Sequence, residues 1–78
     1  MSYGYSVRLI ETNAQADASL IGVRLGKECI RRGISVYETA RRFGVSKQTV
    51  YNWFCGATAP HKKLVQDVEE ALATLLRT

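Results

Sequence analysis

The side chains best suited to chemistry lie between about Ser46 and Cys55. If this stretch is helical, its apolar residues share one face and its polar residues share the other. The apolar face holds Val50, Trp53 and Phe54, which are bulky enough to anchor a short helix on a core. The opposite face is rich in hydrogen-bonding groups, which come from Lys47, Gln48, Tyr51, Asn52 and Cys55. We expect the anchored helix to project this second face towards a partner.

Other kinds of chemistry are poorly represented. Cys29 and Cys55 have no nearby base that would activate a thiol nucleophile. The single His61 and the scattered carboxylates form no acid–base pair at a recognisable spacing. Zinc sites need at least three suitably spaced ligands, and two cysteines without a CxxC spacing do not supply them. We therefore predict no enzyme activity, no metal and no cofactor, and we expect free thiols in a reducing compartment.

Length and charge bound the class of protein. The 78 residues suffice for one domain, with no room for a second unit that senses a small-molecule ligand. Eleven Lys and Arg against seven Asp and Glu give a net charge of +4, and the excess lies within residues 17–60. This favours an acidic partner, most commonly nucleic acid, although a merely basic soluble surface would look the same. Because no apolar run approaches a membrane span and no signal peptide is evident, we expect a cytoplasmic protein without a membrane partner.

Two hydrophobic patterns meet near residue 17. In residues 1–16, Tyr5, Val7 and Leu9 recur with the period of a strand, which predicts a short strand or an N-terminal arm. From there on the period is helical, and a helix over residues 17–32 is expected to end at the glycine that follows. Its apolar face is formed by Ala18, Ile21, Leu25 and Cys29.

Three more helices are predicted further on. Ser35 and Glu38 form a capping box at the start of a short second helix, and Ser46 is a good N-cap for a third. Each of these two helices is followed by a glycine, which adopts the left-handed conformation at little cost. Pro60 suits the first turn of a long last helix. The sequence thus predicts an all-α fold, a small bundle of about four helices that occupies residues 17–78.

The second and third helices, with the turn between them, form a helix-turn-helix motif. Ala40 is small where the two helices are expected to cross. Gly44 supplies a positive φ in a turn too short for a strained side chain, and Val45 fills the corner beneath that turn. A short turn between two steeply crossing helices is the geometry that lets one helix enter the major groove of DNA.

This motif resembles the helix-turn-helix of the Cro and phage-repressor family, also called the XRE family. The matching residues are Ala40, Gly44, Val45, Ser46, Val50 and Trp53. The resemblance extends over about residues 18–76. Since family members bind operator DNA as dimers and usually repress transcription, it implies a homodimer that binds double-stranded DNA sequence-specifically, as a phage or plasmid type repressor. One departure is Val36, where the family usually has a glutamine that clamps a phosphate.

By the same resemblance, four residues of the third helix are base contacts, namely Lys47, Gln48, Tyr51 and Asn52. Gln48 and Asn52 can each bond adenine through two hydrogen bonds, and Lys47 suits the guanine acceptors. Tyr51 would contact a thymine methyl group or a phosphate. The alternative is that these are ordinary solvated residues on an exposed helix.

Phosphate contacts are expected from a wider set, formed by Arg41, Ser46, Thr49, His61, Lys62 and Lys63. The last three begin a helix, where cations oppose the helix dipole. Such a cluster is reasonable if a DNA phosphate lies opposite, and otherwise it is a tolerated surface cluster.

The last helix carries a wide apolar stripe, formed by Leu64, Val65, Val68, Leu72, Leu75 and Leu76. The stripe is wider than one face packed on three helices requires. We expect Leu72, Leu75 and Leu76 to stay exposed and to form a dimer interface. Alternatively, the stripe wraps the first helix in a monomer.

Two other functions remain open from the sequence. A DNA-binding accessory factor for recombination, partition or packaging would use the same motif without regulating a promoter. An interaction module would use the motif to bind protein instead of DNA.

Overall fold

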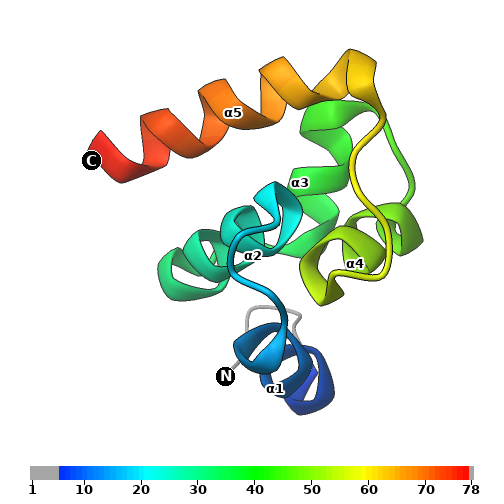
Figure 1. Ribbon diagram of the computed structural model, residues 1–78, viewed down its shortest axis with the longest axis vertical. Coiled ribbons are helices and arrows are strands. Elements are labelled where there is room, and N and C mark those ends of the chain that lie inside the picture. Colours follow the sequence, from blue (N-terminus) through cyan, green and yellow to red (C-terminus); the bar gives the residue numbers. More distant parts are fainter. Residues whose placement is uncertain (1–5, 78) are drawn as a thin grey trace.

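Helix caps and short turns divide residues 6–77, which the computed structural model describes, into five helices (Figure 1). The helices are α1 (Val7–Gln15), α2 (Ile21–Arg32), α3 (Val36–Phe43), α4 (Lys47–Cys55) and α5 (Lys62–Arg77). These residues contain no strand, so the predicted all-α bundle is confirmed, with one more helix than expected. None of the described helices combines the length and apolarity of a membrane span.

The predicted starts of α3 and α4 are confirmed. Ser35 and Glu38 form the capping box, in which Ser35 Oγ accepts a hydrogen bond of 3.0 Å from the Glu38 amide. Glu38 Oε1 accepts one of 3.3 Å from the Ser35 amide in return. Ser46 Oγ caps α4 by accepting a hydrogen bond of 3.1 Å from the amide of Thr49. Each of α2, α3 and α4 ends at a glycine in the left-handed conformation, so local signals set these helix boundaries.

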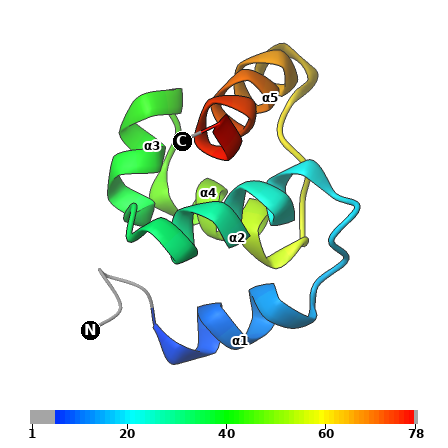
Figure 2. The same cartoon turned by 90° about the vertical axis from the view of Figure 1, so that its left-hand side faces the viewer.

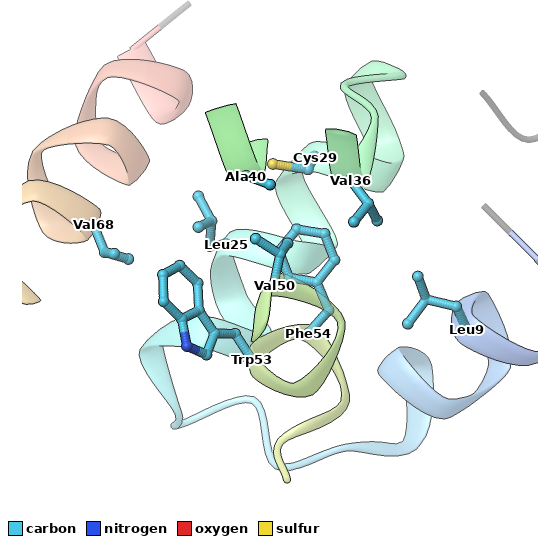
Figure 3. Close-up of a cluster of buried hydrophobic side chains, with 9 residues drawn as sticks. All are labelled: Leu9, Leu25, Cys29, Val36, Ala40, Val50, Trp53, Phe54 and Val68. Atoms are coloured by element: carbon cyan, nitrogen blue, oxygen red, sulfur yellow. The ribbon is translucent and has the colours of Figure 1, made fainter. Parts of the chain in front are cut away.

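The centre of the bundle is α4. Its Val50, Trp53 and Phe54 are buried in one apolar cluster with side chains from all four other helices (Figure 3). Two glycines bring α2 close to this helix. A Cβ at Gly22 would lie 2.9 Å from Trp53 Cβ, and one at Gly26 would lie 2.7 Å from Phe54 Cγ. The missing side chains therefore let α2 support α4 at short range.

Residues 7–15 form a helix, so the predicted strand or arm is wrong there; Tyr5 lies outside the described residues. Ser6 Oγ caps α1 by accepting a hydrogen bond of 3.0 Å from the Leu9 amide. Leu9 and Asn13, one helical turn apart, are only 1% and 3% exposed. This face packs on α2 and α4 (Figure 2). Burial of this face against α2 and α4 therefore outweighs the alternating pattern of the sequence, which favours a strand.

The start of α2 also differs from the prediction. The helix begins at Ile21 and not at residue 17, and Ala18 is exposed outside it. Asp17 Oδ1 accepts hydrogen bonds from the Ser19 hydroxyl at 2.7 Å and from the Ser19 amide at 2.9 Å, and both lower the pKa of the Asp17 carboxyl. Side chains that bond to the nearby backbone in this way favour turns over helix.

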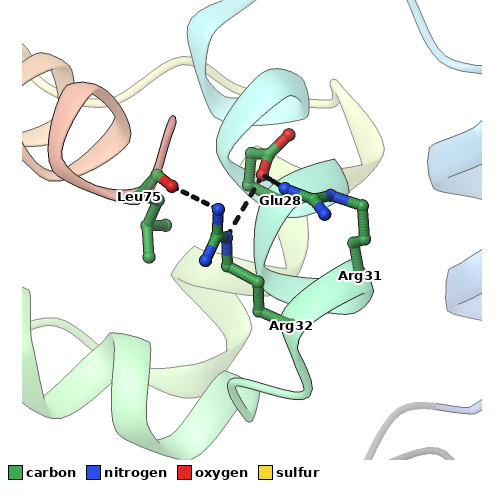
Figure 4. Close-up of polar contacts among 4 residues, drawn as sticks. All are labelled: Glu28, Arg31, Arg32 and Leu75. Carbon is green, nitrogen blue, oxygen red and sulfur yellow. Dashed lines mark hydrogen bonds and ion pairs between the residues drawn. The ribbon is translucent and has the colours of Figure 1, made fainter. Parts of the chain in front are cut away.

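The far end of α5 is tied to α2 by Arg32 (Figure 4). Arg32 Nη2 donates a hydrogen bond to the backbone oxygen of Leu75, and Arg32 Nε lies 3.4 Å from Glu28 Oε1. The same carboxylate oxygen accepts a hydrogen bond of 2.6 Å from Arg31, which is the main reason that the pKa of Glu28 is lowered. Arg32 therefore satisfies a carbonyl in the last turn of α5 and holds that turn on the bundle.

Candidate nucleic-acid interface

The turn between α3 and α4 has the predicted construction. Gly44 has a φ of 66°, and a Cβ there would meet nothing within 4 Å, so backbone conformation and not space favours glycine. The amide of Val45 donates a hydrogen bond of 3.1 Å to the backbone oxygen of Ala40, which closes the end of α3. Val45 itself is half-buried against the core, as expected. Because Ser46 caps α4 directly after Val45, this turn sets the angle between the two helices.

Two amide side chains occupy the middle of the outward face of α4. Gln48 is exposed and Asn52 is half-exposed, one turn apart on the side opposite Val50 and Phe54. Gln48 Nε2 donates a hydrogen bond of 3.0 Å to Asn52 Oδ1. This bond leaves the oxygen of Gln48 and the nitrogen of Asn52 without a partner among the described residues. The pair therefore presents an acceptor beside a donor, and Lys47 stands exposed at the start of the same helix.

Tyr51 lies at the edge of this face. It is half-buried, and its hydroxyl oxygen lies 3.1 Å from Ser6 Oγ at the start of α1. Cys55, also half-buried, lies at the other end of the face, where burial raises the pKa of its thiol and the charge of Arg8 opposes that shift. The sequence predicted Tyr51 on the outward face of this helix, and the structure adds a contact between its hydroxyl group and α1.

The expected phosphate contacts at the start of α4 serve as its cap. Ser46 Oγ accepts from the Thr49 amide and lies 2.9 Å from Thr49 Oγ1. Arg41 is exposed on α3, with its guanidinium 5.8 Å from the centre of the exposed Tyr37 ring. This cation–π interaction restrains the position of the guanidinium group.

The cluster at the start of α5 is exposed as expected, but His61 has a role that the sequence did not reveal. Its Nδ1 accepts a hydrogen bond of 3.1 Å from the Lys63 amide, and its backbone oxygen accepts one of 2.7 Å from Leu64. His61 therefore caps α5. Lys62 and Lys63 are exposed in the first turn, which lies on the same side of Figure 1 as the turn between α3 and α4.

The expected dimer residues are separated by the packing of α5. Leu72 is only 4% exposed and belongs to the monomer core, so the prediction that it lies on a free surface is wrong. The period of the helix turns Leu72 towards α2, while Leu75 is half-buried and Leu76 is 54% exposed. Leu76 borders a shallow hollow between α2 and α5, lined also by Ile21, Arg24, Glu69, Leu72 and Ala73.

The burial of Asn13 was not predicted from the sequence. Asn13 is polar and lies in a segment predicted as an arm, so nothing indicated that its side chain would be buried. Its side-chain amide donates hydrogen bonds of 2.7 Å to the Phe54 carbonyl oxygen and 3.2 Å to that of Val23. Its backbone oxygen accepts one of 2.9 Å from Lys27 Nζ. Two features of the sequence could have predicted this helix. Ser6 is a residue type that caps helices, and Leu9 and Asn13 follow it four residues apart, which is a helical spacing.

Residues 6–77 bring no three His, Cys, Asp or Glu side chains together in a way that could hold a metal ion.

Comparison with known proteins agrees with this geometry. Residues 23–58 match the family model of a homeodomain-like domain, of the helix-turn-helix kind, and this range contains α3, α4 and most of α2. No curated protein and no solved structure matches the chain. The fold and this match together support a helix-turn-helix domain, a kind of domain that commonly binds DNA. The match is to a homeodomain-like domain and does not single out the phage-repressor family.

Proposed function

We propose that this protein binds duplex DNA sequence-specifically by placing α4 in the major groove. The observation that carries the proposal is the Gln48–Asn52 pair, held on the outward face of a helix whose opposite face is buried through Val50, Trp53 and Phe54. A helix anchored in this way can present fixed hydrogen-bonding groups without first ordering them. Side-chain amides suit the paired donor and acceptor that adenine presents in that groove.

The neighbouring groups have distinct roles in this proposal. Lys47 reaches a guanine at the start of α4. Tyr51, tied to Ser6, contacts the edge of the groove with its ring. Phosphates are contacted by Ser46, Thr49, His61, Lys62, Lys63 and Arg41, which position the domain without reading the sequence.

The protein acts as a homodimer and as a cytoplasmic transcriptional repressor of the phage or plasmid type. A single module of this size makes few base contacts, and pairing two of them on half-sites about 34 Å apart raises selectivity. The exposed Leu76, next to Ala73 and the hollow between α2 and α5, provides the apolar surface for a second copy. The role of repressor rests on the resemblance of the turn and its flanking residues to the Cro and phage-repressor family.

Selection of bound duplexes from a random pool, followed by titration of the selected and the random duplex, tests this function. We expect the pool to converge on one sequence that the protein prefers by at least about 1000-fold over random DNA. A two-fold symmetric sequence supports the dimer. Equal binding of selected and random duplexes contradicts sequence-specific readout, and no binding to either contradicts the DNA-binding function and favours a protein-interaction module.

A further inference from the structure

The helix that the sequence did not predict lies beside the proposed recognition helix. α1 packs on α2 and α4, and Figure 1 shows it below both helices. The Ser6 and Tyr51 hydroxyl oxygens are 3.1 Å apart, which places the start of α1 at the edge of the outward face of α4. Any duplex that Gln48 and Asn52 contact therefore approaches α1 as well.

The orientation of α1 is set by buried contacts. Leu9 belongs to the apolar core, and Asn13 bonds to the carbonyl of Phe54 in α4 and of Val23 in α2. Gly26 leaves the space in which this amide sits, since a Cβ there would lie 2.7 Å from Asn13 Nδ2. α1 is thus part of the bundle, and the direction in which its exposed side chains point is defined.

Arg8 is the cation that α1 presents. It is exposed and has no hydrogen bond or ion pair among the described residues. It also lies near Cys55, where its charge opposes the rise in the pKa of the thiol that burial causes. The helical period places Cys55 on the same side of α4 as Gln48 and Asn52. The Ser6–Tyr51 contact and the packing of α1 on α4 place the start of α1, which carries Arg8, at one border of the recognition face.

We propose that α1 is a second DNA-contacting element, in which Arg8 binds a backbone phosphate at the rim of the groove that α4 enters. The proposal rests on the DNA-binding function proposed above and extends its interface beyond the helix-turn-helix. A helix that lies in the major groove has one phosphate backbone on each of its two sides. Because α1 lies beside α4, it faces one of these two backbones. An unpaired guanidinium at this border suits a phosphate oxygen.

The test compares Arg8→Ala with Arg31→Ala, which removes the same charge. Arg31 is an exposed residue of α2 that the helical period places opposite Gly22, and so away from α4. Affinity for the selected and the random duplex is measured over a range of salt concentrations. We expect Arg8→Ala to weaken both complexes several-fold and to reduce the salt slope by about one unit. Arg31→Ala should leave the slope nearly unchanged.

Phosphate ethylation interference locates the contact. Ethylation of one phosphate in each half-site should weaken binding of the parent and have no effect on Arg8→Ala. Equal salt slopes for the two variants, with a parent that binds DNA, would overturn the role of Arg8 and leave the function of α4 intact. A parent that binds no duplex overturns both proposals. Circular dichroism of the variants, whose substituted residues are exposed, establishes that loss of affinity does not reflect unfolding.

Discussion

The side-chain nitrogen of Asn13 lies 2.7 Å from the backbone oxygen of Phe54, which joins the first helix to the last turn of the proposed recognition helix. Carbonyls in the last turn of a helix have no partner within the helix, and a buried one needs a donor from elsewhere. Asn13 supplies that donor from a position only 3% exposed. The stability of the bundle and the placement of α1 therefore depend on the same hydrogen bond.

Replacing Asn13 with Ala should destabilise the protein by about 1–3 kcal/mol, because it removes two buried hydrogen bonds, to the carbonyls of Phe54 and Val23. Asn13→Asp should cost more, since it places a carboxylate against two carbonyl oxygens. Urea unfolding measures both. Gln15→Ala, at an exposed position of the same helix, is the control. If Asn13→Ala lowers the free energy of unfolding no more than Gln15→Ala does, Asn13 does not stabilise the bundle as a buried hydrogen-bond donor.

Gly26→Ala should destabilise the protein by about 1–3 kcal/mol, because the new methyl group meets Asn13 and Phe54 in a packed core. Part of this cost should disappear in the double variant with Asn13→Ala, which removes one of the clashing side chains. Gly44→Ala is the matched control, since it strains the backbone by about 1–2 kcal/mol in open space. Its cost should add to that of Asn13→Ala. If the losses in the free energy of unfolding are additive in both double variants, Gly26 and Asn13 do not act together.

Gln48→Ala or Asn52→Ala should cost about 1–3 kcal/mol on the selected duplex through the loss of contacts to a base. Affinity for random DNA should change little. Because the two amides bond to each other, the double variant should cost less than the sum of the single ones. Gln66→Ala, an exposed glutamine on α5, should bind like the parent. Parent-like binding by both single variants would remove these residues from the recognition face.

Lys62→Gln with Lys63→Gln should weaken binding to every duplex and lower the salt slope by up to about two units. The reason is the loss of two exposed cations from the first turn of α5. Arg31→Gln with Arg77→Gln gives the same change in net charge elsewhere on the surface. If the two double variants shift the slope equally, the lysines act only through net charge.

Leu76→Glu should convert the proposed dimer into a folded monomer at micromolar concentration, because it places a charge on the exposed apolar surface of α5. Leu72→Glu should instead unfold the protein, since that side chain lies in the monomer core. Thr74→Glu, exposed on another side of α5, is the control. Sedimentation measures mass, and circular dichroism measures folding. A parent that is monomeric under these conditions contradicts the proposed dimer.

The sequence alone determined the features that depend on near neighbours in the chain. The capping box of Ser35 and Glu38, the cap at Ser46 and the glycine at residue 44 act over a few residues, so their residue types predict the boundaries of α3 and α4. The separation of Val50, Trp53 and Phe54 from the Gln48–Asn52 face follows equally from the helical period. These local signals also carry the helix-turn-helix motif, which the family match supports.

Contacts between residues distant in sequence were decided only by the tertiary structure. Val7 and Leu9 alternate as in a strand, yet α1 is helical because Leu9 and Asn13 can be buried together on α2 and α4. The apolar stripe of α5 does not indicate which of its leucines contact α2. The sequence therefore predicts Leu72 on the surface, whereas packing on α2 buries it in the core. The contact between Tyr51 and Ser6 was not predicted, because the pattern of one helix carries no information about its neighbour. Local periodicity specifies which faces are apolar, whereas the identity of the surface that covers each face depends on how the whole chain packs.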